Sequence, residues 1–340
     1  MIIQVVQTKG TLLLEDNRES LAKAAAIIKQ GGLVAFPTET VYGLGAAATN
    51  AEAVNSIFAA KGRPADNPLI VHLSDHNQLS LVAREIPDEA KFLADNFWPG
   101  PLSLVLQRSE YIPAEVSAGL PTVAVRMPDH PVALALIDLA GVPVAAPSAN
   151  KSGRPSPTSY RHVLEDLTGK VDAVIRSSIC KIGIESTVLD LTGPSPLILR
   201  PGGLPREDLE KALGRSIGVA VDKKNSLQPA SPGMKYRHYT PRAPLILITG
   251  RKTMRRQMLN RLARYYRRKG FAIGLLNISI QHRLKNSADP EKLAAMFYSY
   301  LRRMDAAGVD IIIAEEVSLS GIGLAVMNRL KKAATRVLRV

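Results

Sequence analysis

Residues 245–334 alternate continuous apolar strands with helices in a regular way. Runs without alternating polar positions are typical of parallel strands that are covered on both faces. A strand–helix–strand alternation of this kind predicts a small doubly wound, Rossmann-like domain with a parallel sheet. We expect strands at 245–249, 271–276 and 309–314, and helices at 253–269, 290–306 and 323–334.

The first 221 residues are a less regular mixture of short helices and short strands. A helix over 21–30 should end at the Gly31-Gly32 pair. Asn50 can cap a second helix, which should end near Lys61. This mixture predicts an α/β sheet with helices packed on it. The expected strands are 33–36, 69–73, 102–106, 122–127, 142–146, 171–175, 187–191 and 197–200.

Residues 222–243 separate these two patterns. They are rich in proline, serine and basic residues, which is typical of a linker. Tyr236, His238 and Tyr239 are unusual in a plain spacer, and we expect the linker to fold over a site and to move as a lid together with the second domain. The predicted domains are therefore 1–221, which carries the site, and 244–340.

Composition narrows the class of protein. No apolar run approaches the roughly 18 residues needed to cross a bilayer, and the N-terminus lacks the pattern of a signal peptide. We therefore expect a soluble, cytoplasmic protein without a membrane contact. The net charge of +14 suggests anionic partners such as nucleotides or RNA.

Cys180 is the only cysteine, which excludes intramolecular disulfides and thiolate metal clusters. A nucleophilic role is possible for a lone cysteine. A small apolar side chain within a strand is the interpretation we prefer for Cys180.

The first segment that suggests chemistry is 36–45, where two threonines and a tyrosine stand beside two glycines. Hydroxyl groups and a close backbone approach suit a small polar ligand, although a polar turn would have the same composition. Residues 43–48 also match G-x-G-x-x-A. We reject a dinucleotide site there, because the next helix begins too late and no suitably placed acid follows.

The second segment is 60–72. Lys61 and Arg63 stand where a helix should stop, with Pro64 behind them. Two cations fixed in this way suit a polyphosphate, and each charge-assisted contact is worth roughly 1.5–3 kcal/mol. The alternative is that Lys61 only caps the helix and Arg63 is solvated. His72 lies in an apolar strand, where a histidine is more often part of the core.

The third segment is 145–158, where a strand leads into a loop that offers Ser148, Asn150, Ser152 and Ser156. Small hydroxyls and backbone N–H groups form anion-binding nests at such places. By itself, a loop of this composition predicts a site only weakly.

The fourth segment joins 183–188 to 199–203. Arg200, like Arg126 earlier in the chain, stands at the end of a predicted strand. An arginine fixed there is suited to grip a phosphate or a carboxylate.

The sequence lacks the motifs of several other classes of enzyme. It contains no GxxxxGK[ST], GxSxG, HExxH or CxxC motif. Hydroxyl groups and fixed cations dominate the loops, and no activated nucleophile is evident. This favours catalysis by positioning and charge stabilisation.

Together the motifs resemble one family. PTETVYGLG, AKGRPADNPLIVH, APSANKSGRPSPT, GIESTV with LRPG, PGMKYRHYTP and GIGLAVMNRLKKAA closely resemble the L-threonylcarbamoyladenylate synthases, in the family's order and over nearly the whole chain. The resemblance implies a YrdC-like twisted mixed sheet with helices, then the linker and a small Rossmann-like parallel-sheet domain. The motifs match the longer, two-domain form of the family.

The resemblance also implies a reaction. Threonine, bicarbonate and ATP would give threonylcarbamoyl-AMP and pyrophosphate, with Mg²⁺ accompanying ATP. A downstream tRNA threonylcarbamoyl transferase machinery would then modify adenosine 37 of tRNA. The resemblance assigns no metal ligand in this chain.

Position by position, the resemblance implies two sets of contacts. Lys61 and Arg63 would also be the catalytic cations, and Tyr236 would close over the nucleotide. The implied L-threonine contacts are Thr40, His72, Arg126, Ala146 and Ser186. The implied ATP contacts are Lys61, Arg63, Asn67, Thr122, Ser148, Asn150, Ser156, Arg200 and Tyr236.

Two alternatives remain open from the sequence. The first is an RNA-binding module of the same fold without adenylation activity, because residues 251–269 hold nine basic residues and no acidic one. The second is a maturation enzyme that handles carbamoyl-AMP. Such enzymes carry zinc-finger segments, and the single cysteine argues against them.

Overall fold

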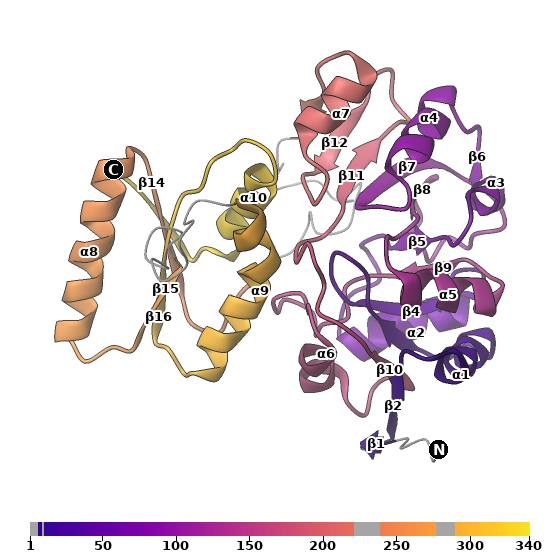
Figure 1. The fold of residues 1–340 in the computed structure, drawn as a ribbon, viewed down its shortest axis with the longest axis horizontal. Coiled ribbons are helices and arrows are strands. Elements are labelled where there is room, and N and C mark those ends of the chain that lie inside the picture. The colour runs from indigo at the N-terminus through magenta and orange to yellow at the C-terminus, as the bar shows by residue number, and fades with distance from the viewer. Residues whose placement is uncertain (1–5, 9, 221–238, 277–289) are drawn as a thin grey trace. The chain divides into compact units, whose positions relative to one another are not determined.

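The computed structural model describes residues 6–8, 10–220, 239–276 and 290–340 (Figure 1). The backbone divides into two compact units, Met1–Ser152 with Ser156–Tyr236, and Gly153–Pro155 with Arg237–Val340. Most of the predicted linker, including Tyr236 and His238, lies outside the described residues. None of the helices in the described ranges is long and apolar enough to cross a bilayer.

The first unit is built on one large mixed sheet, which confirms the predicted α/β class. Its strands follow the order β1-β2-β10-β3-β4-β9-β5-β8-β7-β11-β12-β13, with β6 paired to β7. Parallel pairs such as β5–β8 alternate with antiparallel pairs such as β7–β8. The bounds are β1 Val6–Thr8, β2 Thr11–Glu15, β3 Val34–Phe36, β4 Gly43–Ala47, β5 Ile70–His72, β6 Ala83–Arg84, β7 Leu102–Arg108, β8 Thr122–Arg126, β9 Val144–Ala146, β10 Ala173–Arg176, β11 Thr187–Asp190, β12 Leu197–Arg200 and β13 Gly218–Val219.

Helices pack on this sheet as the sequence pattern predicts. The Asn50 side chain accepts a hydrogen bond from the backbone N–H of Ala53 at 3.1 Å, and Gly62 ends the helix with a φ of 60°. α1 and α5 pack against each other. The helices are α1 Arg18–Lys29, α2 Ala51–Lys61, α3 Leu79–Val82, α4 Asp88–Phe97, α5 Pro131–Ala140, α6 Tyr160–Leu167 and α7 Arg206–Leu213, with a 3₁₀ turn at His76–Gln78.

The second unit has a four-stranded sheet of order β15-β16-β14-β17, in which every pair is parallel. α8 covers one face of this sheet, and α9 and α10 cover the other (Figure 1). This confirms the predicted parallel-sheet domain. The bounds are β14 Leu245–Thr249, α8 Lys252–Arg268, β15 Ile273–Leu276, α9 Pro290–Ala306, β16 Ile311–Glu315, α10 Gly323–Ala333 and β17 Arg336–Arg339.

Among the strands that were not predicted, β4 was missed because glycine is rare in strands. β4 has the sequence GLGAA. A Cβ at Gly45 would come within 2.8 Å of the Phe36 ring and of the Val144 side chain, so close packing requires glycine there. The glycines of the G-x-G-x-x-A match therefore serve sheet packing, in agreement with our rejection of a dinucleotide loop.

The prediction that Cys180 lies in a strand was wrong. Cys180 follows the end of β10 in an irregular segment, where its backbone N–H bonds the carbonyl of Thr158 at 3.1 Å. The side chain is nevertheless buried, and this burial raises the pKa of the thiol to about 12. A thiol that stays protonated is a poor nucleophile, so its role is packing.

Candidate functional site

The four segments predicted to carry chemistry meet in the first unit. The loop that joins β3 to β4 makes backbone hydrogen bonds to the two later segments, far away in the sequence. Because backbone bonds fix both partners, the loops form one assembly. These bonds run from Leu44 N to Pro147 O at 2.9 Å, Tyr42 N to Pro157 O at 2.8 Å, Ile182 N to Glu39 O at 2.8 Å and Gly183 N to Thr40 O at 3.1 Å.

Polar side chains gather on one face of the sheet beside these loops. His72 on β5 lies directly opposite Arg126 on the parallel neighbour β8. Val105 on β7 is opposite Ala124 on β8, so Ser103, two residues before Val105, points to the same face as Arg126. The sheet thus directs an imidazole, a guanidinium and a hydroxyl to one side.

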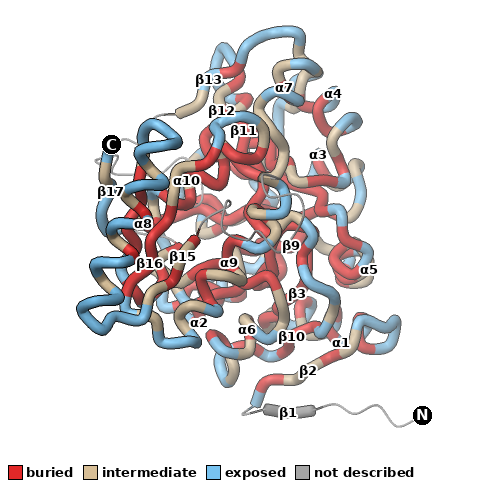
Figure 2. The backbone as a smooth tube through the Cα atoms, turned by 60° about the vertical axis from the view of Figure 1, so that its left-hand side comes forward, coloured by how far each residue is buried: buried red, intermediate tan, exposed pale blue. Residues whose placement is uncertain are grey.

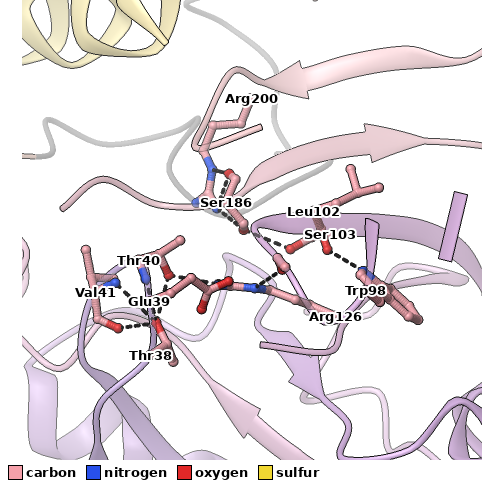
Figure 3. A network of polar contacts seen from close by, with 11 residues as sticks. Thr38, Glu39, Thr40, Val41, Trp98, Leu102, Ser103, Arg126, Ser186 and Arg200 are labelled. Atoms are coloured by element: carbon pink, nitrogen blue, oxygen red, sulfur yellow. Dashed lines mark hydrogen bonds and ion pairs between the residues drawn. The ribbon is translucent and has the colours of Figure 1, made fainter. Parts of the chain in front are cut away.

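Arg126 is the centre of this group (Figure 3). Its Nη1 donates to Thr40 Oγ1 at 2.9 Å, and its Nε donates to the carbonyl of Gly100 at 3.1 Å. Its Nη2 lies 2.5 Å from a carboxylate oxygen of Glu39, with both side chains 4% exposed. Two hydrogen bonds and one ion pair therefore hold the arginine rigidly.

Thr38 fixes the loop that carries Thr40. Its hydroxyl donates to the carbonyl of Val41 at 2.7 Å and lies 2.8 Å from the hydroxyl of Thr40. The backbone N–H of Thr40 bonds the same Thr38 oxygen at 3.2 Å. A side chain that closes its own turn orders the loop without help from another element.

Ser186 and Arg200 form a second cluster on the adjacent strands (Figure 3). Nη2 of Arg200 donates to the carbonyl and the hydroxyl of Ser186, at 3.0 and 3.1 Å. The Ser186 hydroxyl also lies 2.8 Å from that of Ser103. Gly202 makes this approach possible, because a Cβ there would come within 2.1 Å of the Ser186 backbone.

His72 is buried and uncharged. Burial, and then the positive charge of Arg126, lower the pKa of His72 to about 3. Nδ1 lies 3.1 Å from the carbonyl of Ile70, and the ring meets Phe36 edge to face at 6.0 Å. Backbone hydrogen bonds to Ile70 and Val144 oppose this lowering of the pKa without reversing it.

Lys61, the last residue of α2, is hydrogen-bonded to the loop after β9. Its ammonium donates to the carbonyl of Asn150 at 2.6 Å and to the carbonyl of Ser148, and the side chain is buried. The Ser148 hydroxyl donates to the Asn150 side chain at 2.6 Å. The structure therefore brings together three of the residues implied to bind ATP. It also shows that Lys61 does more than cap α2.

Arg63, Asn67 and Thr122 lie beyond this cluster. Arg63 Nη2 donates to the carbonyl of Asn67 at 2.9 Å, and its guanidinium lies over the ring of Phe58 at 5.8 Å. Asn67 precedes β5 and Thr122 begins β8, so both lie where these parallel strands start.

The two predicted sets of contacts meet at Arg200 and Ser186, which are hydrogen-bonded, whereas Thr122 stands apart from the threonine set. His72 and Arg126 lie at the ends of β5 and β8, whereas Thr122 begins β8, about 13 Å of strand before Arg126. Ala146 ends β9 opposite Ile70 and is buried among apolar residues. It can offer a ligand only its backbone or its methyl group.

The sequence reasoning missed three residues that the structure places within the assembly. Glu39 pairs with Arg126, Glu185 accepts a hydrogen bond from the Ser156 hydroxyl at 2.6 Å, and Ser103 contacts Ser186. The signal available for the two glutamates was a carboxylate inside a loop otherwise rich in hydroxyls. The sequence around Ser103 gives no signal of a functional role for that residue.

Within the described ranges, no group of three or more His, Cys, Asp or Glu side chains is arranged to hold a metal ion.

Comparison with known proteins agrees with this geometry. Residues 26–202 match the Sua5, YciO and YrdC family described as telomere recombination, and residues 204–335 match the threonylcarbamoyl-AMP synthase C-terminal domain. The threonylcarbamoyl-AMP synthase of Pyrococcus abyssi is 50% identical over 93% of this chain and 95% of that protein. The enzyme of that name from Bacillus subtilis is 46% identical over 96% of each.

A solved structure extends the comparison to three dimensions. The crystal structure of P. abyssi Sua5 complexed with L-threonine matches with a TM-score of 0.91 and 47% identity, over 97% of this chain and all of that one. Both domains are therefore matched in sequence and in fold. This chain belongs to the two-domain Sua5 family, which includes the threonylcarbamoyl-AMP synthases of P. abyssi and B. subtilis.

Proposed function

We propose that this chain is an L-threonylcarbamoyladenylate synthase, which converts L-threonine, bicarbonate and ATP into threonylcarbamoyl-AMP and pyrophosphate. Full-length relatives with this name and the L-threonine complex of P. abyssi Sua5 support the proposal. The observation that carries it in this chain is the fixed Arg126 group beside the loop held by Lys61.

The chemistry needs no activated protein nucleophile. The amine of threonine captures carbon dioxide, derived from bicarbonate, as a carbamate. A carbamate oxygen then attacks the α-phosphorus of ATP, the bond to the bridging oxygen breaks, and pyrophosphate leaves. The protein must hold two anions together against their repulsion, which buried cations of fixed geometry achieve.

For threonine we propose contacts with Thr40, His72, Arg126, Ala146 and Ser186. Arg126 would bind the carboxylate, because the planar fork of a rigidly held guanidinium matches a carboxylate. The uncharged His72 lets the site hold threonine without adding a second positive charge next to Arg126.

For ATP we propose contacts with residues near the starts of β5 and β8, in the loop after β9 and at the end of β12. Lys61 and Arg63 would act at the phosphates, since both are held by backbone carbonyls at the end of α2. The proposed set is Lys61, Arg63, Asn67, Thr122, Ser148, Asn150, Ser156 and Arg200. Tyr236 belongs to it by the family resemblance and lies outside the described residues.

We propose that Mg²⁺ enters with ATP and is held mainly by the phosphate oxygens. Hard oxygen ligands suit this ion, and the described residues offer no acidic cage for it. When bound, it would neutralise part of the triphosphate charge.

We further propose that residues 1–221 form the catalytic domain, 222–243 the linker and 244–340 the C-terminal domain. In the cytoplasm, the product would pass to a tRNA threonylcarbamoyl transferase machinery. The family resemblance implies this downstream step, and the product, a reactive mixed anhydride, is a suitable donor for a transferase.

Pyrophosphate release tests the proposal. The purified chain is incubated with ATP, bicarbonate and each amino acid in turn, and release should require both bicarbonate and threonine. Release that depends on carbamoyl phosphate instead would favour the maturation-enzyme alternative. No turnover, together with tRNA binding that survives Arg63→Ala, would favour an RNA-binding module.

A further inference from the structure

The positive charge of this chain is confined to its last third. Residues 1–221 hold 20 Lys and Arg against 23 Asp and Glu, whereas residues 222–340 hold 24 against 7. The proposed reaction takes place in the part that is slightly acidic. The excess positive charge therefore requires an explanation other than ATP binding.

The densest basic stretch is α8 with its flanks, residues 251–269, which hold seven arginines, two lysines and no acidic residue. Leu259 and Ala263 bury one side of this helix against the sheet of the second unit. Arg261, Arg264 and Arg268 recur at intervals of three and four residues, so they share the opposite side. All three are exposed, and Figure 2 shows exposed backbone along α8.

This charge pattern opposes the stability of the helix. An exposed helix usually gains from acidic and basic residues four apart, whereas like charges at that spacing repel. Arg251, Lys252 and Arg256 also lie near the positive end of the helix dipole. Arg255 pairs with Glu316 on a neighbouring segment, a contact that serves packing and leaves the outer face positive.

The outer side also presents an aromatic ring among its cations. Tyr265 follows Arg264 directly and is 54% exposed, and its ring packs edge to face on that of Tyr266 at 5.2 Å. Arginine binds phosphates in a forked geometry, and an exposed ring can stack on a base. A row of arginines without acidic neighbours suits the regularly repeated phosphates of RNA, and the exposed ring adds a stacking surface for a base.

We propose that the outer face of α8, formed by Arg261, Arg264, Tyr265 and Arg268, binds RNA. The arginines would contact the phosphate backbone, and Tyr265 would stack on an unpaired base. The choice of tRNA as the RNA rests on the proposed function, because threonylcarbamoyl-AMP is made for a tRNA base. The RNA-binding face itself depends only on the charges, exposure and spacing of α8.

Salt-dependent binding of unmodified tRNA to the full chain tests this inference. The variant R261Q/R264Q/R268Q is compared with R18Q/R84Q/R161Q, which removes three exposed arginines from the first unit. We expect the α8 variant to bind tRNA about 10-fold or more weakly near 0.1 M salt, and the slope of log K against log salt to flatten by about 2.7. The affinity of the matched variant for tRNA should stay within about 2-fold of that of the wild type.

A second variant separates base stacking from charge. Tyr265→Ala should weaken tRNA binding by roughly 3- to 10-fold without changing the salt slope. Pyrophosphate release by these variants should stay at the wild-type rate, and their urea unfolding should match that of the wild type, which shows that both units fold. Loss of release in the wild type, with tRNA binding intact, would contradict the proposed function and leave the α8 inference standing.

Three results would overturn the inference. The first is a wild-type chain that does not bind tRNA. The second is equal weakening by the two triple variants, which would mean that only net charge matters. The third is displacement of tRNA by polyglutamate as effectively as by an equal charge of RNA, which would point to an acidic protein partner.

Discussion

At the scale of single residues, the proposed mechanism depends most on Lys61. We expect Lys61→Ala to lower the rate of pyrophosphate release at least about 100-fold, because it removes a buried cation from the proposed phosphate site and its hydrogen bonds to two carbonyls of the loop after β9. Lys29→Ala is the matched control, since Lys29 is an exposed lysine in the last turn of α1. A Lys61→Ala rate within a few-fold of wild type would show that the triphosphate binds elsewhere.

His72 links the site to pH. The folded pKa of about 3 is below the ordinary value of 6.5, so between these values the unfolded chain binds a proton that the folded chain excludes. Above pH 6.5 the His72 ring is neutral in both states, so it does not lower the free energy of unfolding. Below pH 6.5 the free energy of unfolding falls as the pH falls, by up to about 1.4 kcal/mol per pH unit. Urea unfolding of wild type and His72→Gln from pH 7 to pH 4 should show a flatter pH dependence in the variant. Parallel curves would mean that His72 is not buried as described.

The sequence indicated the predicted contact residues through their motifs, but it could not reveal their pairing. Glu39 and Arg126 are distant in the chain, and each was visible only as a charged residue in a loop or at a strand end. Their ion pair exists because the loop after β3 folds back onto β8. Such a contact depends on tertiary structure, which local composition does not encode.

At the scale of elements, one glycine allows the loop after β12 to pack closely against the start of β11. A methyl group at Gly202 would lie 2.1 Å from the backbone of Ser186, which must then move together with Arg200. We expect Gly202→Ala to lower the free energy of unfolding by about 3 kcal/mol or more, and to slow pyrophosphate release.

The control for that substitution is Gly193→Ala. A Cβ at Gly193 would meet only the carbonyl oxygen of Ser195, at 3.9 Å. The substitution should therefore change the free energy of unfolding by no more than about 0.5 kcal/mol. Both variants can be compared by urea unfolding. Equal stability of the two would contradict the close approach between β11 and the loop after β12.

Elements with a strong local signal could be predicted from the sequence. α2 has its cap at Asn50 and its stop at Gly62, and β14 is a continuous apolar run. β4 and β17 could not be predicted in this way. β4 is rich in glycine, and β17 contains two arginines and forms the edge of its sheet, so neither has the composition of a buried strand.

At the scale of the whole molecule, two units with separate cores account for the two patterns in the sequence. The first unit buries its own apolar clusters, and the second packs α8 on its parallel sheet. The change from irregular to regular alternation after residue 243 predicted the parallel sheet of the second unit, while the domain bounds 1–221, 222–243 and 244–340 stay a prediction. The conformation of the linker was beyond prediction from composition alone.

This division predicts how a truncated chain behaves. Residues 1–221 should fold alone, with a single cooperative urea transition, because the sheet and its helices are complete within that range. The fragment should also lose the salt-dependent tRNA binding of the full chain, since it lacks α8. An insoluble fragment, or one that unfolds without cooperativity, would contradict the independence of the first unit.

The most direct test of the proposed reaction traces the carbon of bicarbonate. The full chain is incubated with ATP, L-threonine and ¹³C-labelled bicarbonate, and the products are identified by mass spectrometry. The proposed reaction predicts threonylcarbamoyl-AMP with one labelled carbon, formed together with pyrophosphate. Threonyl-AMP without the label would contradict it, because the carboxylate that Arg126 is proposed to hold would then be the attacking group.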